Sequence, residues 1–276
     1  EAINSILELA ELKKAGKLKK LLVAGCLTQR YREEIRTELP EVDGMLGTGS
    51  YTDVASAVAE LMEGERPEHF GDIHRTYEDG ERMVTTPPYT AFLKIAEGCS
   101  NGCAFCIIPK LRGRYRSRSM EALVEEARGL AASGVKELIV IAQDITRYGL
   151  DRKDGSTLAK LLDRLCELDF HWIRLHYLYP EAVTDELIET IARQPKILHY
   201  LDIPIQHCND AILKAMRRRN TRAEIEALFA KLRKAMPDVV LRTSLICGLP
   251  GEGEAEFEEL CHFLREQRIQ RAGVFQ

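Results

Sequence analysis

Three cysteines within eight residues are the feature of this sequence with the clearest chemical potential. Cys99, Cys103 and Cys106 follow the spacing C-x3-C-x2-C in a segment rich in Gly and Asn. Three thiolates at this spacing can hold three irons of a four-iron cluster, which leaves the fourth iron open to a small molecule. A closed zinc site would favour four ligands, and the sequence has no matching second pair nearby. A zinc-stabilised binding module and three ordinary buried thiols stay open as alternatives.

Further candidate ligand-binding residues fall at the ends of apolar, strand-like runs. Gln143 and Asp144 close one such run, and Gln206 closes another. A buried Gln needs partners for its amide, and a bound cofactor could supply them. Asp144 could instead cap a helix or turn. Cys247-Gly248-Leu249-Pro250-Gly251 follows a later run, and glycines beside a strand end let a ligand approach the backbone closely.

Two groups of arginines are candidates for binding anions. Four of them, Arg112, Arg114, Arg116 and Arg118, closely follow the cysteines. Guanidinium groups suit bidentate recognition of a carboxylate, a phosphate or RNA, and a solvated loop is the alternative. The run Arg217-Arg218-Arg219 indicates a solvated helix end or a patch that faces RNA. The net charge of −4 does not itself indicate nucleic-acid binding, although a local basic patch would be enough.

The composition indicates a globular protein that acts away from membranes. Hydrophobic residues make up 45% of the 276, and no apolar run approaches the ~20 residues that span a bilayer. The start, Glu1-Ala2-Ile3-Asn4, lacks the basic region of a signal peptide, so we expect a cytoplasmic location. The eight cysteines are therefore expected to serve metal binding, catalysis or packing rather than disulfides. Cys208 and Cys247 lack ligand spacing and are predicted to serve packing, while Cys166 and Cys261 fall within predicted helices as core or surface thiols.

The first part of the chain, residues 1–64, alternates helical and strand-like patterns. Strands are predicted at 21–24 and 45–47, and helices near 3–11, at 29–39 and at 51–62. This order indicates a parallel α/β sheet that begins without its own first strand. Residues 65–88 are polar and turn-rich, which predicts a linker with a hairpin at Asp79-Gly80.

From residue 89 to 276 the alternation of strand and helix is more regular. Strands are predicted at 91–95, 137–142, 172–176, 200–203, 240–246 and 272–275. Helices are predicted at 120–132, 157–168, 184–193, 210–217, 222–235 and 254–266. Six such units close into a partial parallel (β/α)6 barrel, with the cysteines beyond the end of its first strand.

The cysteine motif, with Phe105 before its last cysteine, resembles the radical S-adenosylmethionine superfamily. The resemblance implies that the amino and carboxylate groups of S-adenosylmethionine chelate the open iron. Electron transfer from the cluster would then break a carbon–sulfur bond and release a 5′-deoxyadenosyl radical. The resemblance also implies contacts to this cofactor from Phe105, Gln143, Gln206, Arg242 and Gly248.

Two further segments are similar to the methylthiotransferases, which insert sulfur and a methyl group at an unactivated C–H bond. One is Ile107-Ile108-Pro109-Lys110-Leu111-Arg112-Gly113, and the other is Gly25-Cys26-Leu27-Thr28-Gln29-Arg30-Tyr31. The second implies that residues 1–64 are part of the N-terminal domain that holds a second [4Fe–4S] cluster. Cys26 matches the last of that cluster's three ligands, and the other two would lie upstream. With the C-terminal TRAM domain also missing, the chain is expected to be truncated at both ends.

Motifs on the third and fourth barrel strands resemble one subgroup of these enzymes. They read Arg174-Leu175-His176-Tyr177-Leu178-Tyr179-Pro180 and Leu201-Asp202-Ile203-Pro204-Ile205-Gln206-His207. The subgroup modifies the β-carbon of an aspartate in the small-subunit ribosomal protein S-twelve. The alternative is a transfer-RNA adenosine methylthiotransferase. The resemblance also implies an electron donor such as a flavodoxin, and RNA contact is a further expectation.

Overall fold

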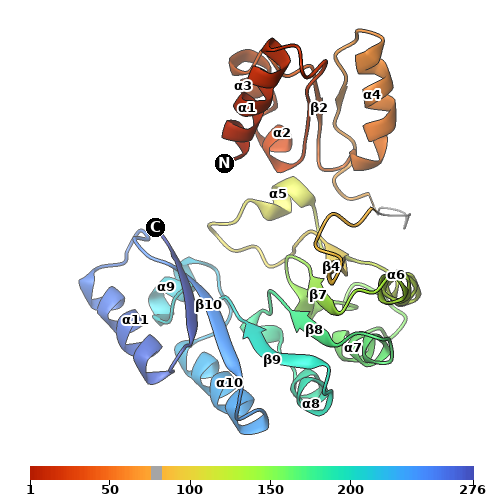
Figure 1. Ribbon diagram of the computed structural model, residues 1–276. Helices are drawn as coiled ribbons and strands as arrows, with labels where there is room; N and C mark the ends of the chain where they lie inside the picture. Colours follow the sequence, from red (N-terminus) through yellow and green to blue (C-terminus); the bar gives the residue numbers. More distant parts are fainter. Residues whose placement is uncertain (76–82) are drawn as a thin grey trace. The chain divides into compact units, whose positions relative to one another are not determined.

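The computed structural model describes residues 1–75 and 83–276, which divide into two units (Figure 1). The N-terminal unit comprises Glu1–Asp79 and Ile107–Arg114, and the C-terminal unit comprises Gly80–Cys106 and Tyr115–Gln276. The chain therefore passes between the units three times. The hairpin predicted at Asp79-Gly80 lies outside the described residues.

The N-terminal unit contains a small parallel sheet in the order β1-β2-β3. Its strands are Leu22–Ala24, Gly44–Leu46 and Glu68–His69, and Val23 is in register with Met45. Its helices are α1 (Ala2–Lys14), α2 (Cys26–Arg30), α3 (Arg32–Glu38), α4 (Val54–Met62) and α5 (Ile108–Arg112), with a 3-10 turn, η1, at Tyr51–Asp53. The parallel α/β pattern predicted for this region is present.

Three details of the N-terminal unit differ from the sequence-based prediction. The helix predicted at 29–39 is divided into α2 and α3, because Tyr31 leaves the helical region with φ −121° and ψ 40°. Strand β3 lies inside the stretch predicted to be a linker and pairs with β2 through Met45 and Glu68. Helix α5, which was not predicted, follows Cys106 and begins with Pro109 in its first turn.

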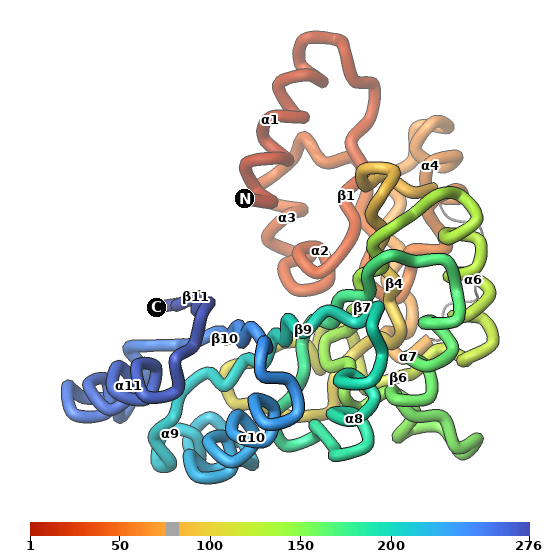
Figure 2. Tube along the Cα trace, turned by 60° about the horizontal axis from the view of Figure 1, so that its bottom comes forward, coloured from red at the N-terminus to blue at the C-terminus, as the bar shows by residue number. Residues whose placement is uncertain are grey.

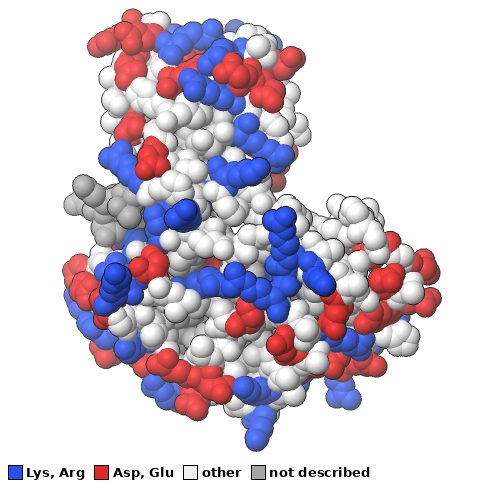
Figure 3. Space-filling model, turned by 180° about the vertical axis from the view of Figure 1, so that it is seen from behind, with Lys and Arg blue, Asp and Glu red and all other residues white. Residues whose placement is uncertain are grey.

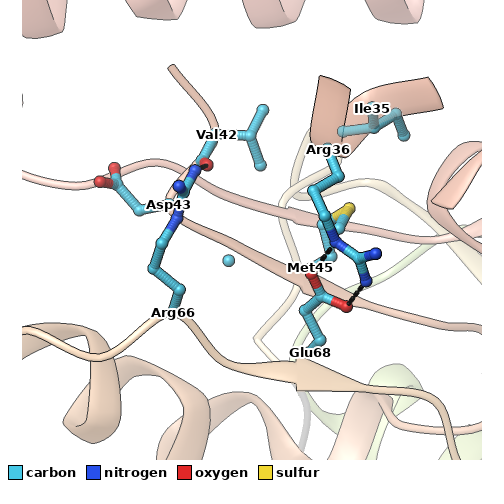
Figure 4. A pocket seen from close by; sticks show the side chains of 8 residues that line it. Ile35, Arg36, Val42, Asp43, Met45, Arg66 and Glu68 are labelled. Atoms are coloured by element: carbon cyan, nitrogen blue, oxygen red, sulfur yellow. Dashed lines mark hydrogen bonds and ion pairs between the residues drawn. The ribbon is translucent and has the colours of Figure 1, made fainter. Parts of the chain in front are cut away.

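A small pocket beside β2 and β3 holds a paired Arg and Glu. Figure 4 shows the side chains of Arg36 and Glu68 pointing toward each other across this pocket of about 100 Å³. Arg36 Nε donates to Glu68 Oε1 at 2.9 Å, and Arg32 Nη2 lies 2.7 Å from Glu68 Oε2. The hydrogen bond from Arg36, with the further contact to Arg32, lowers the pKa of Glu68 from 4.5 to about 2.

The Glu68 carboxylate is expected to stabilise the N-terminal unit above pH 4.5 but not in strong acid. Because its folded pKa is depressed, the contribution is present above the unfolded value and is lost as the pH falls from 4.5 through about 2. Glu68→Gln should therefore lower the urea midpoint at about pH 6 by the equivalent of at most ~1 kcal/mol, since water screens the exposed guanidinium groups. The difference from wild type should shrink toward about pH 3. Glu63→Gln, at an exposed carboxylate, is the control, and an equal effect in both variants would contradict the assignment.

The C-terminal unit is an open six-stranded sheet in the order β11-β10-β9-β8-β7-β4, with every neighbouring pair parallel. The strands are Thr90–Lys94, Glu137–Ile141, Trp172–Leu175, Ile197–Asp202, Val240–Ile246 and Arg271–Phe275 for β4, β7, β8, β9, β10 and β11. The predicted partial parallel barrel is confirmed.

The helices of this unit connect successive strands along the outside of the curved sheet (Figure 2). They are α6 (Met120–Ala132), α7 (Leu158–Cys166), α8 (Asp185–Arg193), α9 (Asp210–Ala215), α10 (Arg222–Ala235) and α11 (Glu254–Glu266). Four of these helices begin at a residue whose side-chain hydroxyl accepts a hydrogen bond from a backbone N–H of the first turn. The residues are Ser119, Thr157, Thr184 and Thr221. No helix in the described part of the chain combines the length and the apolar character that a bilayer crossing requires.

Candidate metal centre

The three cysteines lie on one loop at the carboxyl end of the first barrel strand. After β4, the short strand β5 (Ala96–Glu97) pairs antiparallel with β6 (Arg116–Ser117), and the loop lies between them. Gly98 and Gly102 turn the chain with φ of 78° and 73°, values that glycine adopts without a steric penalty. Cys99 and Cys103 are each 7% exposed, and Cys106 is half-buried. The structure therefore places all three thiols in one sheltered segment.

This arrangement differs from that of a site for one metal ion. Within residues 1–75 and 83–276, no three His, Cys, Asp or Glu side chains are placed to hold a single ion. A four-iron cluster makes a different demand, because each of its three protein-bound irons takes its own thiolate. Burial raises the pKa of the Cys99 thiol above its usual value, so metal binding there must displace a proton.

Two side chains from distant parts of the sequence meet at Cys103. The Tyr179 hydroxyl lies 2.8 Å from Cys103 Sγ, and Arg218 Nη1 lies 3.9 Å from the same sulfur. Arg218 also donates to the Pro204 carbonyl at 2.7 Å and stacks over the Tyr179 ring at 4.1 Å. The prediction that residues 217–219 form a solvated helix end is wrong for Arg218, which is only 7% exposed. Neither contact was predicted, and the only signal in the sequence was an arginine directly after the predicted helix at 210–217.

Asp144 attaches the cysteine loop to the second barrel strand. Its side chain is fully buried and accepts hydrogen bonds from Asn101 Nδ2 at 2.8 Å and from the Thr146 backbone at 3.0 Å. Arg147 Nε lies 3.3 Å from Asp144 Oδ2, the oxygen that accepts from Asn101. Burial raises the pKa of Asp144, although the hydrogen bonds from Thr146 and Asn101 oppose this shift. Both a turn-capping role and a role in placing the cysteine loop are therefore combined in one residue.

The predicted glutamines lie at the same edge of the sheet. Gln143 Nε2 donates to Glu97 Oε1 at 3.2 Å, while its own oxygen is buried without a hydrogen-bond partner. Gln206 has φ of 71°, and Tyr177, just after β8, has φ of 65°. Such left-handed backbone in non-glycine residues is uncommon and concentrates at ligand sites. The unpaired oxygen and the strained backbone both favour a ligand at this edge.

Arg242 lies inside a charged network rather than alone. Its Nη1 is 2.5 Å from Asp202 Oδ1, and His176 Nδ1 is 3.4 Å from Asp202 Oδ2. Burial alone would raise the pKa of Asp202, but the hydrogen bonds from His176 and Arg242 outweigh it and lower the pKa. The carboxylate therefore stays ionised and holds Arg242 in place on β10.

Phe105 and the loop after β10 are two walls of one pocket. The pocket of about 280 Å³ is lined by Ala104, Phe105, Ile212, Ala215, Met216, Leu249 and Pro250. Gly248, with φ of 80°, begins this turn, and Glu252 ends it 3.5 Å from the fully buried His207. The pocket is apolar and opens next to the cysteine loop, so it could take a flat apolar group.

Arg118, the last of the four arginines that follow the cysteines, has partners within the C-terminal unit. Arg118 Nη2 pairs with Glu126 at 2.7 Å and Nη1 donates to the Lys94 carbonyl, which indicates a structural role. The face in Figure 3 carries Lys and Arg next to Asp and Glu. Cys26 begins α2 in the N-terminal unit, after Gly25 with φ of 124°. Its unit contains no other cysteine.

The model of the radical SAM superfamily matches residues 93–264 of this sequence. The chain belongs to the radical SAM superfamily. Its whole length is 53% identical to the "Ribosomal protein uS12 methylthiotransferase RimO" of Lachnoclostridium phytofermentans and 49% identical to the protein of the same name in Clostridioides difficile. It spans 63% and 62% of the length of these two relatives.

Solved structures of radical SAM proteins share the fold. The TsrM methyltransferase of Kitasatospora setae, with tryptophan and a SAM analogue bound, matches 98% of this chain with a TM-score of 0.73 and 13% identity, over 58% of its own length. The cobalamin-dependent enzyme OxsB matches 95% of this chain with a TM-score of 0.62 and 15% identity, over 41% of its own length. At these identities, the likeness concerns the fold alone.

Proposed function

We propose that this chain is the radical SAM part of a methylthiotransferase that modifies an aspartate of ribosomal protein uS12. The observation that carries the proposal is the identity of about half of all residues, along the whole chain, to proteins named uS12 methylthiotransferase. The chain spans only 63% and 62% of the length of these two relatives. The activity, substrate and partners of the whole protein are therefore part of the proposal.

The residues at Cys99, Cys103 and Cys106 fit a [4Fe–4S] cluster. Arg218 is a buried cation, and no carboxylate pairs with it among the ion pairs of the described residues. A buried charge without a partner is costly, and thiolates bound to a cluster would supply the missing negative charge. The apolar pocket at Phe105 and the unpaired oxygen of Gln143 would serve S-adenosylmethionine, together with Gln206, Arg242 and Gly248.

The chain's own residues would bind, orient and shelter these groups. When bound, the cluster and S-adenosylmethionine supply a radical able to abstract hydrogen from an unactivated carbon. Asn101, held by Asp144, fixes the cysteine loop, while Asp202 holds Arg242 ready for an anionic group. The low exposure of Cys99 and Cys103 keeps water from the reacting region.

Cys26 is proposed as one ligand of a second [4Fe–4S] cluster, whose other ligands would come from outside this chain. The proposal includes a flavodoxin-like electron donor, a cytoplasmic location, and RNA contact at the arginines that follow the cysteines, Arg112, Arg114, Arg116 and Arg118. Iron, sulfide and zinc analysis of anaerobically purified protein tests the cluster. A colourless protein with one zinc and no sulfide would leave the zinc-stabilised binding module as the better reading.

Mass spectrometry of uS12 from a deletion strain tests the substrate. The methylthio group on the aspartate should be absent in the deletion strain, should return with the wild-type gene and should not return with Cys103→Ala. Transfer-RNA nucleosides from the same cells should be unchanged. An unaltered uS12 with altered transfer-RNA nucleosides would replace this function with that of a transfer-RNA methylthiotransferase.

A further inference from the structure

We propose that Tyr179 and Arg218 raise the reduction potential of the cluster held at Cys103 by stabilising its reduced form. The inference rests on the proposed function, because it requires a cluster at this cysteine. It goes further by assigning a role to two residues that the cysteine motif does not include.

The first contact supplies a hydrogen bond of known direction. The Tyr179 hydroxyl and Cys103 Sγ are 2.8 Å apart. A thiolate bound to iron carries no proton, so the hydroxyl must be the donor. Hydrogen bonds to cluster sulfurs, together with the net charge of a cluster and its exposure to solvent, set its potential. Loss of this donor should therefore make reduction harder.

The second contact places a positive charge, shielded from solvent, next to Cys103. Arg218 is 7% exposed, and its Nη1 is 3.9 Å from Cys103 Sγ. Its Nε is buried without a hydrogen-bond partner, and its only described direct acceptors are the Pro204 carbonyl and the cysteine sulfur. Because reduction adds negative charge next to it, this cation favours the reduced form.

The backbone shows how Arg218 reaches this position. Helix α9 ends with the Arg218 N–H bonded to the Leu213 carbonyl and the Arg217 N–H bonded to the Lys214 carbonyl. This is the Schellman pattern, in which a left-handed residue reverses the chain. Here that residue is Arg217, with φ of 57°. The reversal buries Arg218 and leaves Arg217 and Arg219 exposed.

The same turn is attached to the cysteine loop. The Ala104 N–H, next to Cys103, donates to the Met216 carbonyl at 2.9 Å. The cation and the sulfur are therefore held by neighbouring backbone atoms, and the Tyr179 ring lies against the guanidinium at 4.1 Å. Such supporting residues tune a metal site without ligating it.

The reduction of the cluster is a one-electron transfer. One electron passes to the cluster from a low-potential one-electron donor, which is oxidised by one electron, and no bond forms or breaks in the protein. Tyr179 and Arg218 change only the equilibrium of this transfer. They are positioning residues, and a shift in potential is the readout that a merely structural role would not produce.

Redox titration with dithionite, followed by electron paramagnetic resonance, tests the proposal in protein loaded with iron and free of S-adenosylmethionine. Tyr179→Phe and Arg218→Met should each lower the ratio of reduced to oxidised cluster at a fixed potential by about threefold to tenfold. For a one-electron couple this is a shift of about 30 to 60 mV. The matched controls are Tyr148→Phe, whose buried hydroxyl bonds to the Arg118 carbonyl, and Arg219→Gln, whose side chain is exposed.

The outcomes separate this inference from the proposed function. Wild-type protein without a cluster would refute the proposed function. A loaded wild type with unchanged potentials in both variants, or with shifts equal to those of the controls, would overturn the inference alone. If either variant fails to load iron, the other decides the question.

Discussion

Replacing Cys103 with alanine is expected to remove the cluster and with it the cleavage of S-adenosylmethionine. Among the proposed ligands, Cys103 is the one whose sulfur is contacted by both Tyr179 and Arg218. Cys103→Ala leaves one iron without a thiolate and leaves that guanidinium without its negative partner. Iron and sulfide per chain should fall to near background, and the rate of cleavage should fall by more than about 100-fold.

The control for this prediction is a cysteine elsewhere in the same unit. Cys261 lies on α11 and is half-buried, and it has no ligand spacing to the cluster cysteines. Cys261→Ala should keep the iron, the visible absorption and the cleavage rate of the wild type. Wild-type cleavage by Cys103→Ala would refute the assignment of this residue as a ligand.

Asp144→Ala is expected to produce the largest loss of stability among the site residues. The substitution removes a fully buried carboxylate, which leaves the Asn101 amide without its hydrogen-bond acceptor and Arg147 without its ion-pair partner. Removing one partner of a buried charged pair costs roughly 3 kcal/mol or more. The urea midpoint of the C-terminal unit should fall accordingly. The iron content should fall as well, because Asn101 helps to position the cysteine loop.

Asp154 offers a matched control with the same local pattern at the surface. It accepts a hydrogen bond from the Ser156 backbone two residues later and pairs with Arg152 at 2.6 Å. Its side chain is 41% exposed, so Asp154→Ala should lower the urea midpoint much less than Asp144→Ala and leave the iron content unchanged. Equal losses of stability in Asp144→Ala and Asp154→Ala would contradict the explanation that the burial of Asp144 makes its loss costly.

Local sequence was enough to predict the barrel and its cysteine loop. Leu138, Ile173 and Leu241 lie on short strands that are followed by amphipathic helices, and all three side chains are buried. The cysteines are close in sequence, so their shared loop follows from their spacing. The N-terminal unit was harder to predict, because its strands are only two or three residues long.

The surroundings of the cysteines depend on contacts between residues far apart in sequence. Tyr179 is 76 residues from Cys103, and Arg218 is 115 residues away. Arg218 is buried although its two neighbours, Arg217 and Arg219, are exposed to solvent. The difference arises from the left-handed backbone of Arg217, which reverses the chain. No periodicity in the sequence carries that information. The link from Asp144 to Asn101, across 43 residues, was missed for the same reason.

The threefold passage of the chain between the units limits how the protein can be divided by cloning or proteolysis. Residues 107–114, which directly follow Cys106, belong to the N-terminal unit, where Thr48 bonds to the Leu111 carbonyl. An expression clone that starts at residue 80 would keep this segment but lose its packing partners, exposing the buried Leu111 in the segment that follows Cys106. A barrel prepared in this way would misreport cluster stability, whereas a clone that replaces residues 107–114 with a short polar linker would isolate the barrel more faithfully.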